Sequence, residues 1–243
     1  MLSLNLEKLI LPNNEIHFYY ADINDFISKV GVMQERLTSD EKLRAGQFKF
    51  QTDQNRFIIA RWLLRSLLSN YLELDFGEMI LKYGEFGKPF FNTNQNIKFN
   101  LSHSGDMIVF GFVKNFNIGV DVEMFKSNFN VMDIALKFFS KKEVETLLTL
   151  PEYKREVAFY RCWTRKEAII KADGSGMSFP LNTFSVTIDS DDKAELIEMS
   201  NGDLNKEKWR LFSIKLSVDY LAAVAVEGNI GHISSKALTL LEL

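Results

Sequence analysis

The segment 118–123, with the sequence IGVDVE, places two carboxylates at a spacing that suits a metal site. Because successive side chains of a strand point to opposite faces, Asp121 and Glu123 are expected on the same face. Neighbouring carboxylates repel each other unless a cation lies between them, and Mg²⁺ prefers a few carboxylates together with water and phosphate oxygens. A solvated strand edge with two unrelated acids is the competing interpretation, because a D-x-E pattern alone is common.

The segment 159–176, FYRCWTRKEAIIKADGSG, carries the next group of polar side chains. On a helix, Trp163, Glu167 and Lys171 share one stripe because each is four residues from the next. Glu167 could then be a third metal carboxylate, while Lys166 and Lys171 could meet phosphate oxygens and stabilise charge on a leaving group. The alternative is a core tryptophan beside an ordinary surface Glu–Lys pair, which is worth about 0.2–0.5 kcal/mol.

A turn of small residues follows the strand-like segment 97–101 and carries Ser102, His103 and Ser104. Hydroxyls, exposed backbone N–H groups and an imidazole together can cradle a phosphate. A Ser–His hydrolase is the rival, but both serines are adjacent to His103 and the chain has no G-x-S-x-G elbow. Cys162 is expected to be a buried, inert thiol within a helix.

Basic side chains are frequent at 41–48 and 53–65, and another lies in the turn at 87–90. Arg44 and Arg56 could reach a phosphate, and Lys88 lies in a Gly-Pro turn that suits the close approach of a ligand. For each of these residues a solvated surface position is the alternative. The chain has neither a G-x-G-x-x-G fingerprint nor a P-loop, so neither dinucleotide nor P-loop nucleotide binding is supported.

The hydrophobic pattern predicts the helices and strands that must position these groups. Capping-box pairs begin helices near Ser39 and after Ser140, and an apolar stripe predicts a helix at 53–71. A long helix free of Pro and Gly is expected at 152–173, with Gly174 placed to end it. Strands are expected at 15–20, 79–83, 97–101, 107–113, 183–188, 209–216 and 219–226.

The order of these elements repeats loosely, which predicts two α+β halves joined near 114–117. The N-terminal half is expected to span 1–116, and the C-terminal half, which carries the acidic strand, to span 117–243.

Composition excludes several classes of protein. With 243 residues, 46% of them hydrophobic and 25% charged, the chain can bury a proper core and is not disordered or fibrous. A formal net charge of −3 argues against nucleic-acid binding, and no apolar run approaches the roughly 18 residues of a membrane span. The single cysteine excludes an internal disulfide and is typical of a cytoplasmic protein.

Five segments occur in one order: GKPF at 87–90, FNLSHSG at 99–105, IGVDVE at 118–123, FFSKKE at 138–143 and FYRCWTRKEAIIKADGSG at 159–176. Together they resemble the 4′-phosphopantetheinyl transferases of the surfactin-synthetase-activating type, over roughly residues 38–190. The resemblance implies an α+β fold in which two similar α/β halves form an intramolecular pseudo-dimer, with coenzyme A in the cleft between them. A pseudo-dimer within one chain implies a monomer.

The resemblance also implies which residues form the site. It assigns Mg²⁺, or Mn²⁺, to Asp121, Glu123 and Glu167. It assigns the pyrophosphate to Lys171 and matches Lys166 to the basic, coenzyme A-binding residue just before the metal-binding Glu167. It assigns the 3′-phosphate to Arg44, Arg56, Ser102 and His103, the adenine to Lys88 and Pro89, and a part in activity to Glu143.

The implied reaction is the attack of a serine hydroxyl, on an apo acyl or peptidyl carrier protein, at the β-phosphorus of coenzyme A. Adenosine 3′,5′-bisphosphate leaves, and phosphopantetheine stays on the serine. Glu167, Glu143 or a metal-bound water could take the serine proton, and the sequence leaves this choice open. It also leaves open whether the carrier serves fatty acid, polyketide, nonribosomal peptide or glycolipid synthesis. The segment 124–132 offers Phe125, Phe129 and Met132 either to the carrier or to ordinary packing.

Two other functions compete with this interpretation. A Mg²⁺-dependent pyrophosphohydrolase could use the same carboxylates without a protein substrate, and a binding module for coenzyme A or a carrier would have no turnover. The joint presence of Asp121, Glu123, Glu167 and Lys171 favours an enzyme, because a binding module need not keep a metal cage.

Overall fold

The fold is built on two larger β-sheets, each covered by a long helix. It is known from a computed structural model, which describes residues 2–91, 94–126, 129–174, 176, 179–199 and 206–241. The first sheet has the order β11 (His232–Ala237), β1 (Glu15–Asp22), β5 (Met107–Lys114), β4 (Ile97–Ser104). The second has the order β6 (Ile118–Met124), β10 (Tyr220–Glu227), β9 (Trp209–Lys215).

Short strands and helices complete the described part of the chain. Two-stranded sheets pair β2 (Lys82–Tyr83) with β3 (Pro89–Phe90), and β7 (Phe184–Val186) with β8 (Leu196–Met199). The α-helices are α1 (Val30–Glu35), α2 (Ser39–Ala45), α3 (Gln51–Leu72), α4 (Val131–Phe138), α5 (Lys141–Thr149) and α6 (Glu152–Asp173). Short 3-10 turns lie at Ile23–Asp25, Ile27–Lys29, Phe76–Glu78, Leu181–Thr183 and Lys206–Lys208.

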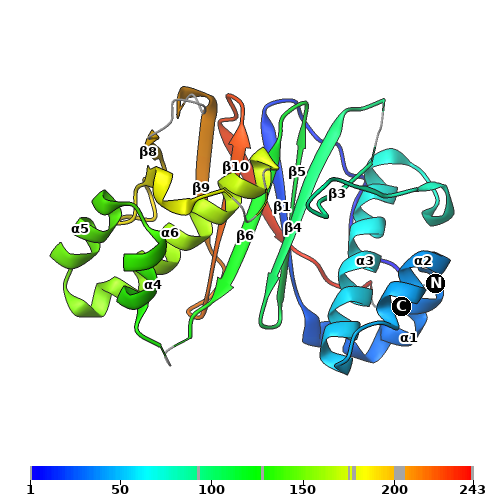
Figure 1. Cartoon of the computed structure of the whole chain (residues 1–243). Coiled ribbons are helices and arrows are strands. Elements are labelled where there is room, and N and C mark those ends of the chain that lie inside the picture. The colour runs from blue at the N-terminus through cyan, green and yellow to red at the C-terminus, as the bar shows by residue number, and fades with distance from the viewer. Residues whose placement is uncertain are drawn as a thin grey trace.

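The two larger sheets pack face to face, with α3 outside the first and α6 outside the second (Figure 1). Strand β5 shows why this arrangement suits the sequence, because its residues from 107 to 113 are all buried. Phe110 and Phe112 pack in the core that α3 covers, whereas Val109 and Val113 pack in the core between the sheets. A strand buried on both faces needs apolar residues at consecutive positions, and MIVFGFV supplies them.

Most predicted elements are confirmed. Thr38 and Ser140 each cap a helix within a capping box, and Gly174 ends α6 in the left-handed conformation with φ 86°. The predicted strand at 79–83 is only partly right, because Met79 ends a 3-10 turn and is buried in the core. The strand itself covers only Lys82–Tyr83.

The last strand of the chain joins the sheet of the first half, because β11 pairs in parallel with β1. The predicted boundary between residues 116 and 117 falls in the turn between β5 and β6 and stays a prediction. The α+β fold of two α/β halves is confirmed. None of the helices in the described part of the chain combines the length and apolarity that crossing a membrane requires.

Candidate active site

A cavity of about 750 Å³ lies between α3 and α6. Its walls come from these two helices, from α2, from β4, and from β3 with the turn that precedes it. Of the residues that the sequence nominated, its lining includes Arg44, Arg56, Lys88, Pro89, Ser102, His103, Glu167 and Lys171. Residues from five separate segments therefore meet at one cavity.

Strands β4 and β6 belong to different sheets, and polar side chains of β4 connect them. Asn100 accepts a bond from the backbone N–H of Val120, Ser102 donates to Asp121 Oδ1 at 3.1 Å, and Ser104 donates to Glu123 Oε2 at 2.8 Å. Alternate residues of FNLSHSG thus point at the acidic strand. Each carboxylate of the D-x-E pair is oriented by a serine hydroxyl.

Gly119 allows β6 to lie directly on α6. A Cβ atom at this position would lie 2.0 Å from the carbonyl oxygen of Ala168 and 2.4 Å from the backbone nitrogen of Ala172. This close approach brings Lys171, on α6, to Asp121, on β6. The Lys171 ammonium lies 2.6 Å from Asp121 Oδ1 and 2.9 Å from the hydroxyl of Ser102.

Burial raises the pKa values of the three acidic residues, and the charge of Asp121 adds to the effect at the other two. Burial raises the pKa of Asp121, which is 4% exposed, and the ion pair with Lys171 only partly opposes this. Burial also raises the pKa values of Glu123 and Glu167, and in both cases the charge of Asp121 raises them further. Negative charge is therefore concentrated at this end of the cavity.

The three carboxylates of Asp121, Glu123 and Glu167 have the chemistry of a metal site. Asp121 Oδ2 is buried and has no hydrogen-bond partner among the described residues, which leaves an oxygen free for a cation. Mutual repulsion of the three carboxylates also favours a cation. Within the described ranges, however, no three acidic, histidine or cysteine side chains converge as a ready-made metal cage. The residue types fit Mg²⁺, and the Asp121 carboxylate is currently paired with Lys171.

The α3 side of the cavity is basic. Arg56 is fixed by bonds to Asp53 at 2.7 Å and to the carbonyl of Gly105 at 3.2 Å, while its buried Nε has no partner among the described residues. The imidazole of His103 is exposed beside it. Partial desolvation, followed by the charges of Arg56 and Lys171, lowers the pKa of His103. A neutral imidazole among guanidinium groups is suited to an anionic ligand.

Lys88 lines the cavity, but its ammonium holds protein backbone. It donates to the carbonyls of Ile118 at 2.9 Å and Lys171 at 2.6 Å, so the turn before β3 is tied to both β6 and α6. Burial, followed by the charge of Lys98, lowers the pKa of Lys88 to about 8. Pro89 is buried next to it in the cavity wall.

Two of the predicted site residues lie elsewhere. Lys166 is 0% exposed and Glu143 is 1% exposed, and the two form an ion pair at 2.9 Å that does not line the cavity. Lys166 also donates to the carbonyl of Leu181, and Glu143 accepts from the backbone N–H of Val186. In the structure both residues anchor α6 to α5 and to the segment 181–186, and the expected contact of Lys166 with phosphate and the expected part of Glu143 in activity stay predictions.

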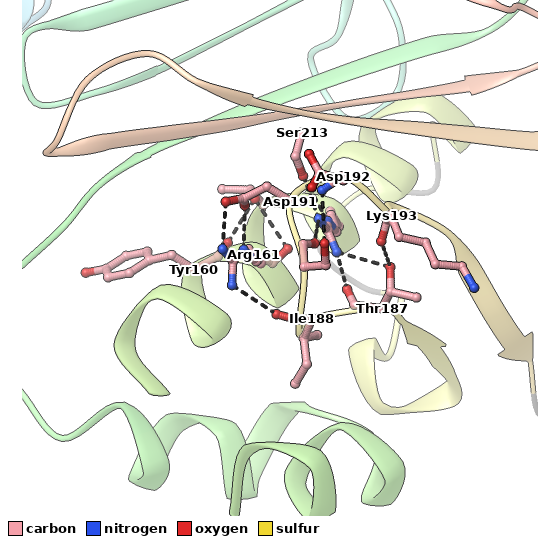
Figure 2. A network of polar contacts seen from close by, with 11 residues as sticks. Tyr160, Arg161, Thr187, Ile188, Asp191, Asp192, Lys193 and Ser213 are labelled. Atoms are coloured by element: carbon pink, nitrogen blue, oxygen red, sulfur yellow. Dashed lines mark hydrogen bonds and ion pairs between the residues drawn. The ribbon is translucent and has the colours of Figure 1, made fainter. Parts of the chain in front are cut away.

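The far side of α6 is held by two arginines one turn apart. Arg161 points to Asp191 and to the carbonyl of Ile188 (Figure 2). Arg165 is completely buried, and its guanidinium donates to Thr187, Ser190 and Ser213. These contacts fix the rotation of α6, which presents Glu167 and Lys171 to the cavity. Cys162 is buried, as predicted, and burial raises the pKa of its thiol.

The structure adds three residues to the site and gives two of the nominated aromatic residues a packing role. The cavity lining also includes Phe57, Arg61 and Phe86, which the sequence did not nominate. The spacing of Phe57 and Arg61, four apart on a helix beginning near Asp53, was the available signal. Phe125 and Phe129 pack on Tyr160 at 4.8 Å and 6.5 Å between ring centroids, which favours ordinary packing over contact with a carrier.

Comparison with known proteins agrees with this geometry. A sequence profile described as the 4′-phosphopantetheinyl transferase superfamily matches residues 117–225, and one described as 4′-phosphopantetheinyl transferase, N-terminal, matches residues 27–112. The 4′-phosphopantetheinyl transferase HetI of Nostoc sp. is 30% identical over 224 residues, which cover 91% of each chain. The 4′-phosphopantetheinyl transferase Sfp of Bacillus subtilis is 31% identical over 160 residues, which cover 66% of this chain and 70% of Sfp.

A mammalian protein is similar as well. The L-aminoadipate-semialdehyde dehydrogenase-phosphopantetheinyl transferase of Rattus norvegicus is 29% identical over 206 residues, which cover 77% of this chain and 66% of the rat protein.

Proposed function

Because this chain belongs to the 4′-phosphopantetheinyl transferase superfamily, we propose that the cavity between α3 and α6 is the site where it transfers phosphopantetheine from coenzyme A to a carrier protein. The chain is a phosphopantetheinyl transferase, coenzyme A is the substrate of its family, and carrier protein domains are the acceptors.

One contact carries the assignment. The Lys171 ammonium bonds both Asp121 and Ser102, so a single side chain joins α6, β6 and β4 at the wall of the cavity. Each of these three elements carries one of the sequence motifs. If the motifs had only structural parts, nothing would require them to meet at one cavity. A shared site for a phosphorylated substrate gives all three a role.

The charge distribution supports one orientation of coenzyme A. Arg44, Arg56 and His103 would receive the 3′-phosphate, and the turn with Lys88 and Pro89 would lie along the adenine. The diphosphate would then reach Lys171 and Glu167 on the α6 side of the cavity. The Lys88 ammonium is occupied by backbone carbonyls. We therefore propose that the aliphatic stem of Lys88, rather than its charge, contacts the adenine.

The reaction forms a bond between the carrier serine oxygen and the β-phosphorus of coenzyme A. The bond from that phosphorus to the bridging oxygen breaks, and adenosine 3′,5′-bisphosphate leaves with the electron pair. Lys171 would neutralise the charge that grows on the leaving phosphate. Glu167 would accept the serine proton, because its carboxylate lines the cavity and stands one helical turn from Lys171.

We assign Mg²⁺ to Asp121, Glu123 and Glu167. The free, buried Oδ2 of Asp121 and the mutual repulsion of the three carboxylates support this assignment. When bound, the metal would neutralise charge on the diphosphate, and Mn²⁺ could replace it in this part. Because the described residues do not form a complete cage, metal affinity should depend on the phosphate oxygens of the substrate.

We further propose that the enzyme acts as a cytoplasmic monomer. The two halves already bury the core between the sheets within one chain, and the only cysteine is a free, buried thiol.

The test is intact-mass spectrometry of apo acyl and peptidyl carriers incubated with the enzyme, coenzyme A and Mg²⁺. We expect each accepted carrier to gain the mass of one phosphopantetheine group on its serine, with adenosine 3′,5′-bisphosphate as the second product. Cleavage of coenzyme A without any carrier would instead indicate a pyrophosphohydrolase. Binding of coenzyme A without a product would indicate a binding module.

A further inference from the structure

Arg61, on α3, is a buried cation in the wall of the cavity. It is only 7% exposed, and its Nη1 atom has no hydrogen-bond partner among the described residues. A buried, unpaired donor on a charged group costs free energy, and more so than on a neutral group. Because Arg61 lines the cavity, a small rotation of its guanidinium would turn an unpaired N–H toward a ligand there, which is the available source of an acceptor.

The surroundings of Arg61 add positive charge. Its guanidinium lies 5.4 Å from the ring centroids of both Phe57 and Tyr83, and the guanidinium of Arg44 lies over the same rings at 5.6 Å and 5.7 Å. Two like charges thus share one aromatic platform. Burial lowers the pKa of Arg61, the charges of Arg44 and Arg65 lower it further, and Tyr83 and Glu41 act in the opposite direction.

The carboxylate of Glu41, which acts on Arg61, is already paired with another arginine. Glu41 accepts two bonds from Nε of Arg65, at 3.1 Å and 2.9 Å, and both of these residues are buried. Asp53 is likewise bonded to Arg56. The basic end of the cavity therefore holds more cations than its own carboxylates balance, and an anionic ligand group would resolve the excess.

We propose that Arg61 is a specificity-determining residue that hydrogen-bonds the 3′-phosphate of coenzyme A and so selects it over the dephosphorylated nucleotide. This inference rests on the proposed function, which places coenzyme A in the cavity. The 3′-phosphate is the fitting group because Arg61 stands on the same aromatic platform as Arg44, which is assigned to that phosphate, whereas the diphosphate is assigned to Lys171 on α6. A phosphate monoester also carries nearly two charges, which suits a site with several guanidinium groups.

Isothermal titration calorimetry can test this with coenzyme A, dephospho-coenzyme A and adenosine 3′,5′-bisphosphate. We expect Arg61→Met to weaken coenzyme A and adenosine 3′,5′-bisphosphate by about tenfold or more, the range of a charge-assisted hydrogen bond, and dephospho-coenzyme A by less than about twofold. Arg36→Met is the matched control, because Arg36 is exposed, lies over the ring of Phe76 at 5.2 Å and does not line the cavity.

Each other outcome contradicts the proposal. An equal loss for coenzyme A and dephospho-coenzyme A would make Arg61 a wall or adenine contact, and no loss for either would make it purely structural. If Arg61→Met fails to fold, Arg61→Gln replaces it in the same titrations, because this change removes the charge and keeps a polar amide. An unchanged preference for coenzyme A over dephospho-coenzyme A in Arg61→Gln overturns the proposal. Failure of the unmodified enzyme to bind coenzyme A would instead remove the proposed function, and this inference with it.

Discussion

The ammonium of Lys171 lies 2.6 Å from Oδ1 of Asp121, so an ion pair joins the last turn of α6 to the middle of β6. Asp121 is nearly inaccessible to solvent, whereas the Lys171 side chain is 30% exposed and lines the cavity. This asymmetry gives Lys171 two tasks. It compensates a buried carboxylate, and it presents a cation to whatever binds in the cavity.

Replacing Lys171 should separate these two tasks. Lys171→Met keeps the aliphatic stem but leaves Asp121 without its cation, so we expect a loss of about 1–3 kcal/mol in the free energy of unfolding. Turnover should fall strongly, while affinity for coenzyme A should change less, because the charge acts mainly on the leaving group. Chemical denaturation, carrier labelling and calorimetry measure the three quantities. The double variant Asp121→Asn/Lys171→Met is the control, and it should recover stability without recovering turnover; recovery of turnover would contradict the catalytic role.

Gly119 should tolerate no side chain. In Gly119→Ala the new Cβ would meet backbone atoms of α6, beginning with the Ala168 carbonyl oxygen at 2.0 Å, and backbone cannot move aside cheaply. We expect a loss of about 3 kcal/mol or more in the free energy of unfolding, at or above the upper end of ordinary overpacking. Gly231→Ala is the control, because a Cβ there meets nothing within 4 Å. Equal melting temperatures for the two variants would show that β6 and α6 are not held as closely as described.

The charge of Lys88 should make stability depend on pH. Burial lowers the pKa of Lys88 from 10.5 to about 8, so between these values the unfolded chain binds more protons than the folded protein. The free energy of unfolding should therefore rise with pH across this window, because the buried charge is lost. Chemical denaturation at several pH values gives the free energy of unfolding of wild type and of Lys88→Met, and the difference between the two isolates the effect of Lys88. Lys82→Met, at an exposed position, is the control. A difference that stays flat or falls between pH 8 and 10.5 would contradict this assignment.

Binding of coenzyme A should raise the pKa of His103. In the free protein, partial desolvation and the charges of Arg56 and Lys171 lower that pKa, and a phosphate beside the imidazole would favour the protonated form. Binding near pH 6.5 should therefore take up protons. Calorimetry in two buffers of different ionisation enthalpy measures the uptake, and His103→Gln should abolish most of it. Proton release, or an unchanged uptake in His103→Gln, would place the phosphate elsewhere.

Much of the site follows from simple periodicity in the sequence. Alternation along a strand places Asp121 and Glu123 together, and spacing of four on a helix places Glu167 beside Lys171. Helix geometry turns Lys166 about 100° away from Glu167, a signal that the prediction for Lys166 did not use. Its pairing with Glu143, from another helix, depends on tertiary packing that no local pattern encodes.

Other features had weak signals or none. β11 is mostly exposed and its sequence, HISSKA, lacks an apolar alternation, so its parallel pairing with β1 is set by the chain's return across the first sheet. Arg61 looks like one helix arginine among several, and only the fold shows that it is buried at the cavity.

The most direct test of the central claim is the initial rate at which Glu167→Gln converts an apo carrier into holo-carrier, followed by intact-mass spectrometry at saturating coenzyme A and Mg²⁺. Glu152→Gln, in the exposed first turn of the same helix, is the matched control. If the cavity between α3 and α6 is the active site and Glu167 accepts the serine proton, Glu167→Gln should be slower by about 100-fold or more with an unchanged fold. The control should keep the wild-type rate. A Glu167→Gln enzyme that modifies the carrier at close to the wild-type rate would contradict the account.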